Sequence, residues 1–205
     1  MNAPQLSQPL PQFKHIKRFW DRAREIPVAL INPGEVYVTK QHELISTLLG
    51  SCIAVCMRDK ISKVGGMNHF KLPAVSTHKA AVIDTNYGQY AMELLINEIL
   101  KNGGKKQNLE CKVYGGGNVI ASMTNPIGTK NIQFALDYLR EERVPILHQE
   151  TGFDCAQQVY YHPLSGNSFS VAKSKVSQEE LKKAEEKYLK NVNTDTESQG
   201  AIFFD

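Results

Sequence analysis

The chain has 205 residues, of which 41% are hydrophobic and 22% are charged, and these values are typical of one soluble domain with a sizeable core. The formal net charge of +3 is too small to indicate a nucleic-acid-binding protein. No apolar run approaches the roughly 20 residues that a membrane helix needs, and the polar, proline-rich start lacks the apolar segment of a secretory signal, so we expect a cytoplasmic protein without a transmembrane segment.

Residues 1–26 predict a tail and an arm outside the main domain. Residues 1–12 are polar and proline-rich, and we expect them to be disordered. In the following segment, FKHIKRFWDRAREI, apolar residues recur at helical spacing and the opposite face is basic. This pattern predicts a basic amphipathic helix, which would bind a membrane surface or an acidic partner, or pack on its own domain.

Residues 27–176 predict the main domain. The expected strands are 36–39, 44–49, 52–57, 64–70, 111–114, 144–147, 159–161 and 168–171. The expected helices are 86–101, capped by Asp84 or Thr85, and 130–143. The second helix joins two strands in a β-α-β crossover, and the last two strands form a hairpin. The chain therefore predicts an α/β fold, a single compact layered domain with a mixed, largely antiparallel sheet and flanking helices.

The triplet Gly115-Gly116-Gly117 follows one of these strands. It lacks the G-x-G-x-x-G spacing of a dinucleotide site, so it predicts a tight turn or close packing. Beyond the main domain, residues 177–205 predict a charged helix and a polar linker that ends in Ala201-Ile202-Phe203-Phe204. Such an apolar end is expected to dock on the domain or on a partner.

The four cysteines, at positions 52, 56, 111 and 155, are expected to be free thiols, because no export signal is recognised. The only close pair has C-x3-C spacing and no second pair accompanies it, so we expect no metal site. We expect Cys56, Cys111 and Cys155 to be passive thiols.

Cys52 and His69 lie on two strands that are expected to be neighbours. A four-residue loop over 59–62 would pair Arg58 with Lys63, and the same register places Cys52 directly opposite His69. A bulge in the glycine pair of the second strand would change this register. The spacing thus predicts either a nucleophile with its base or two unrelated core residues.

A neighbouring imidazole favours the thiolate form of a cysteine and can later protonate a leaving group. A third group should orient the imidazole ring, and Ser46, with Thr47 as the alternative, is the candidate on the preceding strand. Backbone N–H groups around Gly50, Ser51 and Cys52 can hold an oxyanion.

Two motifs, STLLGSC at 46–52 and GGMNHFKLP at 65–73, closely resemble the signature of the chemoreceptor glutamine deamidases, the CheD family. Further segments that resemble the family are PGEVYVT at 33–39, VYGGG at 113–117, GTKN at 128–131 and the hairpin at 159–171. The segment ETGFDCAQQ at 150–158 departs from the glycine- and arginine-containing pattern of the family, which concerns the expected receptor contacts and not the chemistry.

The resemblance implies a cysteine hydrolase, a protein-glutamine glutaminase that converts glutamine side chains of methyl-accepting chemotaxis receptors to glutamate. Some members also hydrolyse glutamate methyl esters. Cys52 would match the nucleophile, His69 the general base, and Ser46 a hydroxyl that is commonly threonine in the family. Gly50, Ser51 and Asn68, within the same motifs, are the expected substrate or oxyanion residues.

The implied reaction needs no metal or cofactor. The implied partners are the cytoplasmic helices of membrane-bound receptors and a chemotaxis phosphatase of the CheC type. A non-catalytic adaptor that binds receptors or this phosphatase is the alternative.

Overall fold

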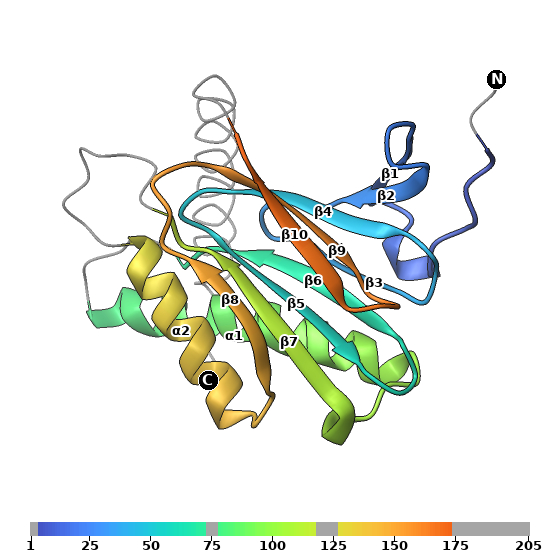
Figure 1. The fold of residues 1–205 in the computed structure, drawn as a ribbon. Helices are drawn as coiled ribbons and strands as arrows, with labels where there is room; N and C mark the ends of the chain where they lie inside the picture. Colours follow the sequence, from blue (N-terminus) through green and yellow to red (C-terminus); the bar gives the residue numbers. More distant parts are fainter. Residues whose placement is uncertain (1–3, 73–77, 118–126, 174–205) are drawn as a thin grey trace, which may run out of the picture.

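The computed structural model describes residues 4–72, 78–117 and 127–173, with the side chains of the first helix described from residue 87 onward. Within these residues, ten strands form two five-stranded sheets that pack face to face, and two α-helices cover the outer face of one sheet (Figure 1). Sheet A has the order β1-β2-β4-β9-β10, and sheet B has the order β3-β6-β5-β7-β8.

The strands of sheet A are β1 (Lys17–Asp21), β2 (Ile26–Leu30), β4 (Leu44–Leu49), β9 (Gln157–His162) and β10 (Asn167–Ala172). The strands of sheet B are β3 (Val36–Thr39), β6 (Gly65–Phe70), β5 (Ile53–Asp59), β7 (Leu109–Gly115) and β8 (Ile146–Thr151). The helices are α1 (His78–Lys101), α2 (Ile127–Glu141) and the short 3-10 turns η1 (Pro11–Phe13) and η2 (Lys106–Asn108).

The predicted fold class is confirmed: the described residues form a single α/β domain with mixed sheets. The pairs β2–β4 and β7–β8 are parallel, and the other described pairs are antiparallel. The predicted β-α-β crossover is β7-α2-β8, and the predicted last hairpin is β9-β10. The strands divide between two sheets because β4 and β5, although consecutive, do not pair with each other.

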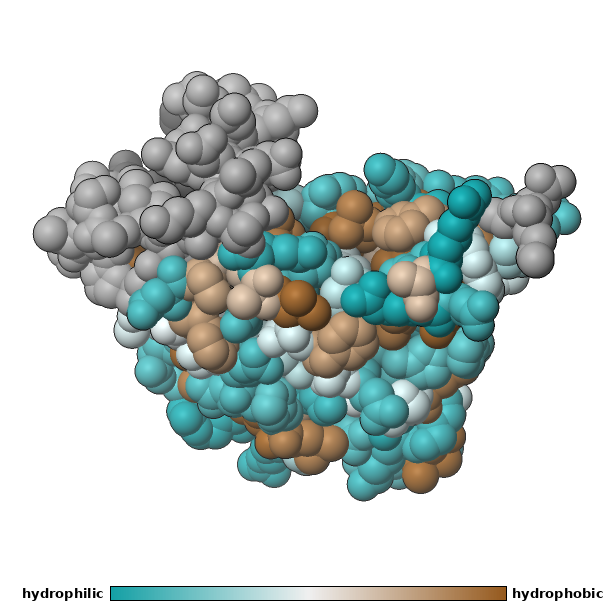
Figure 2. Space-filling view, turned by 45° about the horizontal axis from the view of Figure 1, so that its top comes forward, coloured by the Kyte–Doolittle hydropathy of each residue, from teal (hydrophilic) through white to brown (hydrophobic). Residues whose placement is uncertain are grey.

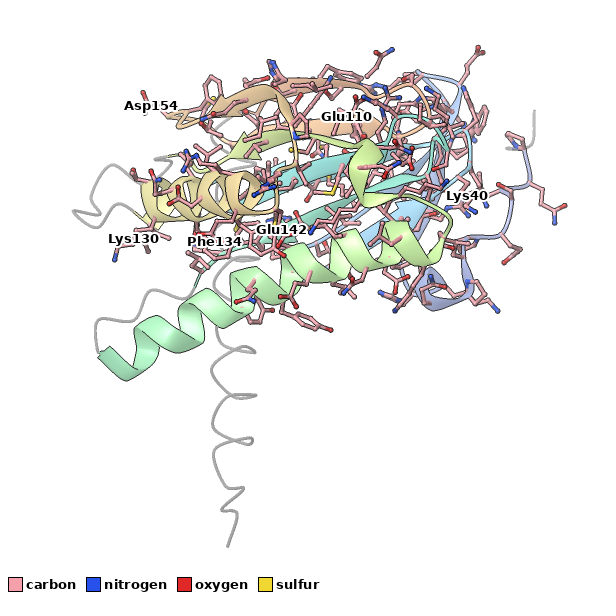
Figure 3. All side chains as sticks on the ribbon, turned by 90° about the horizontal axis from the view of Figure 1, so that it is seen from below. Lys40, Glu110, Lys130, Phe134, Glu142 and Asp154 are labelled. Atoms are coloured by element: carbon pink, nitrogen blue, oxygen red, sulfur yellow. The ribbon has the colours of Figure 1, made fainter. Side chains whose placement is uncertain are left out.

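The central strand of sheet B, β5, is buried on both faces over its first five residues. All residues from Ile53 to Met57 of β5 are 0% exposed, because one face of the strand packs on sheet A and the other on the helices. Seen from below, α1 and α2 lie across this sheet (Figure 3). Phe134 of α2 packs on Gly88 of α1 so closely that a Cβ at Gly88 would lie 2.6 Å from Phe134 Cε1.

The outer face of sheet A carries no helix within the described residues. Phe19, Phe169 and Val171 are 40–42% exposed there. The ring of Phe169 stacks on Tyr160 at a centroid distance of 4.9 Å, and the Arg24 guanidinium lies 4.4 Å from the Tyr160 ring centroid. Apolar and hydrophilic side chains are mixed on the side of the molecule seen in Figure 2.

The predicted amphipathic helix over 13–26 is wrong, because most of this segment belongs to the hairpin of β1 and β2. Asp21 Oδ1 accepts hydrogen bonds from the N–H groups of Ala23 (2.9 Å) and Arg24 (3.1 Å), which closes the hairpin turn. The helical spacing of the apolar residues indicates only a weak preference for helix, and the pairing of β1 with β2 outweighs it.

A buried ion pair anchors this hairpin. Arg18, expected on an exposed basic face, pairs with Glu43 at 2.5 Å between Nη2 and Oε2, and both side chains are buried. Tyr37 and Thr39 also donate to Glu43 Oε1. The backbone carbonyl of Ser7 accepts from Arg18 as well, so the tail contacts the domain at this point.

Two further predictions concern the helical segments. Helix α1 begins at His78 and not near residue 86, so Asp84 and Thr85 lie inside the helix instead of capping it. The predicted helix and apolar end of residues 177–205 lie outside the described residues.

Candidate active site

Cys52 lies where the chain passes from sheet A to sheet B. Strand β4 ends at Leu49 and β5 begins at Ile53, so Gly50, Ser51 and Cys52 form the bend between them. The Cys52 side chain is 0% exposed. The predicted strand over 52–57 therefore begins one residue later, and the cysteine precedes it.

The glycine triplet at the end of β7 holds this bend. The N–H of Gly116 donates to Cys52 O, and the N–H of Gly117 donates to Gly50 O, both at 2.7 Å. Gly115 has φ 103°, and a Cβ there would lie 2.1 Å from Cys52 O. Only glycine allows this approach, which confirms the prediction of close packing.

Asn131 ties the same bend to α2. Its Nδ2 donates to Ser51 O at 2.7 Å, and its Oδ1 accepts from the N–H of Leu72 at 3.0 Å. The side chain is fully buried, on the face of α2 that also buries Ala135 and Leu139. This role of Asn131 was not predicted, although a polar residue on the apolar face of an amphipathic helix was the available signal.

His69 lies on β6, directly opposite Ala54 of β5. The predicted pairing of His69 with Cys52 is wrong by two residues, because the loop begins after Asp59, whose N–H donates to Val64 O at 2.9 Å. A shift of two keeps every side chain on its predicted face, since the side-chain period of a strand is two. His69 therefore still faces sheet A, and it is 1% exposed.

The hydroxyl that contacts His69 belongs to Thr47, at 2.7 Å between Oγ1 and Nδ1. Thr47 Oγ1 also donates to the carbonyl of Ile31 at 2.8 Å. Because a hydroxyl has one hydrogen and the Ile31 carbonyl can only accept, His69 Nδ1 must be the donor to Thr47. The neutral ring then carries its basic lone pair on Nε2.

Ser46, the first candidate for this role, hydrogen-bonds elsewhere. Its hydroxyl donates to Val159 O at 2.8 Å and accepts from Gln158 Nε2 at 2.6 Å. Within the described residues, the structure therefore favours Thr47, the alternative, as the hydroxyl that orients His69.

Asn68, an expected substrate or oxyanion residue, faces α1 instead of sheet A. Its Oδ1 accepts from the N–H of Val55 at 2.9 Å, and its Nδ2 lies 3.1 Å from Ala91 O and 3.4 Å from Met92 Sδ. It is fully buried and points away from the face of His69. Its position fits a structural link between β5, β6 and α1.

Two of the other cysteines are held as neutral thiols. Burial raises the pKa of Cys56 well above its ordinary value, and burial together with the charge of Glu110 raises the pKa of Cys111 to about 12. Neither is a nucleophile at neutral pH, because the thiolate is the reactive form. Cys155 is partly exposed.

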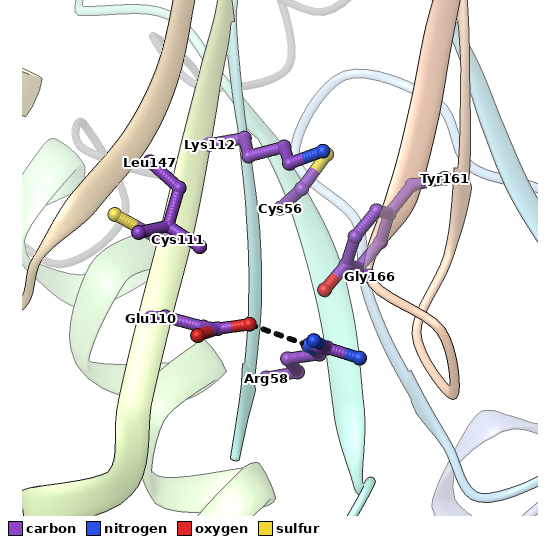
Figure 4. Close-up of a pocket in the computed structure, with 8 residues that line it drawn as sticks. All are labelled: Cys56, Arg58, Glu110, Cys111, Lys112, Leu147, Tyr161 and Gly166. Carbon is purple, nitrogen blue, oxygen red and sulfur yellow. Dashed lines mark hydrogen bonds and ion pairs between the residues drawn. The ribbon is translucent and has the colours of Figure 1, made fainter. Parts of the chain in front are cut away.

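A small pocket between the sheets lies toward the other end of β5 from Cys52 (Figure 4). Arg58 and Glu110, on the neighbouring strands β5 and β7, form an ion pair in its lining at 2.7 Å between Nε and Oε1, and the Lys112 ammonium donates to Ser168 Oγ at 2.9 Å. Its lining residues are Cys56, Arg58, Glu110, Cys111, Lys112, Leu147, Tyr161 and Gly166. None of the predicted site residues lines this pocket.

Within the residues that the structure describes, no group of three or more His, Cys, Asp or Glu side chains is arranged to hold a metal ion. No described helix is long and apolar enough to cross a membrane.

Comparisons with known proteins agree on one family. The family model described as CheD chemotactic sensory transduction matches residues 72–172. A probable chemoreceptor glutamine deamidase CheD of Halorhodospira halophila is 40% identical over 190 residues, which cover 90% of this chain and 88% of the relative. Similar relatives are the CheD 1 protein of Dechloromonas aromatica, 43% identical over 73% of this chain and 75% of its own, and the CheD protein of Hahella chejuensis, 41% identical over 88% and 86%. The chain belongs to the CheD family.

Proposed function

We propose that this protein deamidates glutamine side chains of methyl-accepting chemotaxis receptors, with Cys52 as the nucleophile and His69 as the general base. The observation that carries the proposal is the chain of hydrogen bonds from His69 Nδ1 through Thr47 to Ile31 O. It fixes the imidazole in the tautomer whose Nε2 can take a proton from a thiol. The names of the relatives, probable chemoreceptor glutamine deamidases, supply the substrate.

The reaction proceeds in two steps. The Cys52 thiolate attacks the carboxamide carbon, and His69 gives its proton to the departing nitrogen, so ammonia leaves and a thioester forms. Water, deprotonated by His69, then attacks the thioester, which releases glutamate and returns the thiol. The net reaction consumes one water and produces one ammonia for each glutamine.

The bend at residues 50–52 stabilises the oxyanion of each tetrahedral intermediate through its backbone N–H groups. Carbonyls at Gly50, Ser51 and Cys52 are fixed by three hydrogen bonds, so the peptide planes that carry these donors are fixed too. Because Cys52 and His69 are 0% and 1% exposed, a local movement must admit the carboxamide.

Each conversion adds one negative charge to a receptor helix and creates a methylation site. The same thiol and base also hydrolyse a glutamate methyl ester, in which methanol replaces ammonia as the leaving group. The protein acts in the cytoplasm at membrane-bound receptors, and a phosphatase of the CheC type is its second partner.

The test is mass spectrometry of a receptor cytoplasmic fragment after incubation with the protein. The wild type replaces NH2 by OH on specific glutamines, and the mass of each such peptide rises accordingly. Cys52→Ala abolishes this change and His69→Ala nearly abolishes it, whereas Cys155→Ala, which removes a partly exposed thiol, retains it. Full conversion by a folded Cys52→Ala protein would instead favour the non-catalytic adaptor, in which binding is the function.

A further inference from the structure

Gln157 is the first residue of β9 and faces the space between the sheets. It lies directly opposite Leu49, the last residue of β4 before the Cys52 bend. Val159, two residues further along the same face of β9, lies opposite Thr47, which contacts His69. Gln157 therefore lies on the same inner face of sheet A as Thr47. On this face, the pair Leu49–Gln157 is the next one after Thr47–Val159 in the direction of the bend.

The Leu49 side chain connects this position to the nucleophile. A Cβ built on Gly115 would lie 3.2 Å from Leu49 Cδ1 and 2.1 Å from Cys52 O, so Leu49 and Cys52 meet across Gly115. Side chains directly opposite each other on antiparallel strands have Cβ atoms about 4.5–5.5 Å apart. The long side chain of Gln157, next to Leu49, thus reaches the same corner of the interior.

The amide of Gln157 is buried without a complete set of hydrogen bonds. The residue is 6% exposed, and its Oε1 is fully buried with no hydrogen-bond partner among the described residues. A buried, unpartnered amide oxygen lowers stability, such atoms are rare in native proteins, and a catalytic or binding role is one of the explanations for keeping one. Its neighbour Gln158, on the other face of the strand, is bonded to Ser46 Oγ at 2.6 Å.

We propose that Gln157 is a specificity residue that binds the substrate carboxamide, its Oε1 accepting a hydrogen bond from the substrate N–H2 group. This inference rests on the proposed function and assigns one contact within it. A glutamine carboxamide supplies the missing donor, whereas a glutamate carboxylate or methyl ester has none. The contact therefore favours the amide substrate over the product and over the ester.

The test is Gln157→Met, which keeps the length of the side chain and removes the acceptor, with Gln158→Met as the matched control. For deamidation of a glutamine-bearing receptor fragment, Gln157→Met lowers kcat/KM by about 3- to 10-fold, the effect of one neutral hydrogen bond, mostly through KM. The inhibition constant of the same fragment in its glutamate methyl ester form, used as a competitor, does not change. Gln158→Met leaves both quantities, the kcat/KM for the glutamine form and the inhibition constant of the ester form, as in the wild type.

Stability separates this contact from a structural role. Gln157→Met removes an unpartnered polar atom from the interior, so its urea midpoint equals or exceeds that of the wild type while its activity falls. Three results for Gln157→Met would each overturn the assignment. They are an equal loss of binding to the glutamine and ester forms of the fragment, an unchanged kcat/KM for deamidation, and a urea midpoint so low that unfolding accounts for the lost activity. A wild-type protein without deamidase activity would overturn the proposed function itself, so the two failures can be told apart.

Discussion

At the scale of single residues, one hydroxyl group orients His69, the proposed general base. Thr47 Oγ1 donates to Ile31 O and accepts from His69 Nδ1, so it holds both the ring plane and the tautomer. Thr47→Val keeps the shape of the side chain and removes this acceptor. We expect kcat to fall by about 10- to 100-fold, because the ring can then adopt the other tautomer, as steady-state deamidation assays would measure.

Two controls accompany this variant. Thr47→Ser keeps the hydroxyl and should recover most of the activity, with the pH profile of kcat returning to that of the wild type. Ser46→Ala, one residue away on the same strand, should lower kcat much less, because Ser46 bonds to β9. A larger loss in Ser46→Ala than in Thr47→Val would restore Ser46 as the orienting residue.

Ser46 and Thr47 show how far the roles of single residues can be predicted from sequence. Cys52 and His69 were predicted from their motifs, and the predicted face of His69 survived a register error because the error was two residues. Choosing between Ser46 and Thr47 required knowing that β4 faces sheet B across the interior and does not pair with β5. Strand alternation alone does not contain that information.

At the scale of elements, the glycine triplet after β7 sets the position of the Cys52 bend. Gly115→Ala introduces a Cβ 2.1 Å from Cys52 O at a φ of 103°, so the bend must move. We expect loss of deamidase activity together with a lower free energy of unfolding, measured by urea denaturation.

Gly152→Ala is the matched control for backbone strain. Gly152 also has a positive φ, 84°, but a Cβ there would have no heavy atom within 4 Å. This variant should lose only the roughly 1–2 kcal/mol of the left-handed conformation and keep its activity. Equal losses of stability in the two variants would show that the contact with Cys52 O is unimportant.

The turn between β5 and β6 predicts a pH dependence. Burial alone would raise the pKa of Asp59, but hydrogen bonds from the N–H groups of Ser62, Ile61 and Lys105 and from the Asn108 side chain lower it from 3.8 to about 2. The group therefore stabilises the fold above about pH 4, and this contribution, at most about 2 kcal/mol, disappears as the pH falls toward 2.

Asp59→Asn checks this effect, because asparagine resembles the protonated acid. In urea titrations the variant should be less stable than the wild type at pH 7, and the difference should shrink between pH 4 and pH 2. A difference that stays constant over this range would contradict the assignment to the Asp59 charge.

Strands were more predictable than the N-terminal segment. Strands 36–39 and 44–49 begin and end where polar turns interrupt runs of β-forming residues, and the structure gives them the same bounds. Residues 13–26 have helical spacing, but their conformation depends on Glu43, which buries Arg18 and pins the hairpin to the sandwich. A partner 25 residues away is not visible in a local pattern.

At the scale of the whole molecule, the division into two sheets was the least predictable feature. Residues 53–57 of β5 are apolar on both faces. This pattern fits a strand of a single sheet with helices on both faces, and it fits equally a strand with helices on one face and a second sheet on the other. Only the pairing of the strands distinguishes these two arrangements. Strand β4 pairs with β2 and with β9, and β9 lies more than 100 residues away in the sequence.

Because the chain passes from one sheet to the other at Cys52, substitutions in the core between the sheets are expected to affect activity. The sulfur is carried by the crossover between the sheets, the imidazole by sheet B, and the hydroxyl that aligns it by sheet A. A change in the separation of the two layers, caused by a substitution anywhere in their shared interior, would misalign the three groups of the proposed site while the protein stays folded. The deamidation rate is then more sensitive to the spacing of the two sheets than the melting temperature is. Substitutions in the core far from the site are expected to lower the rate even where they leave the melting temperature nearly unchanged.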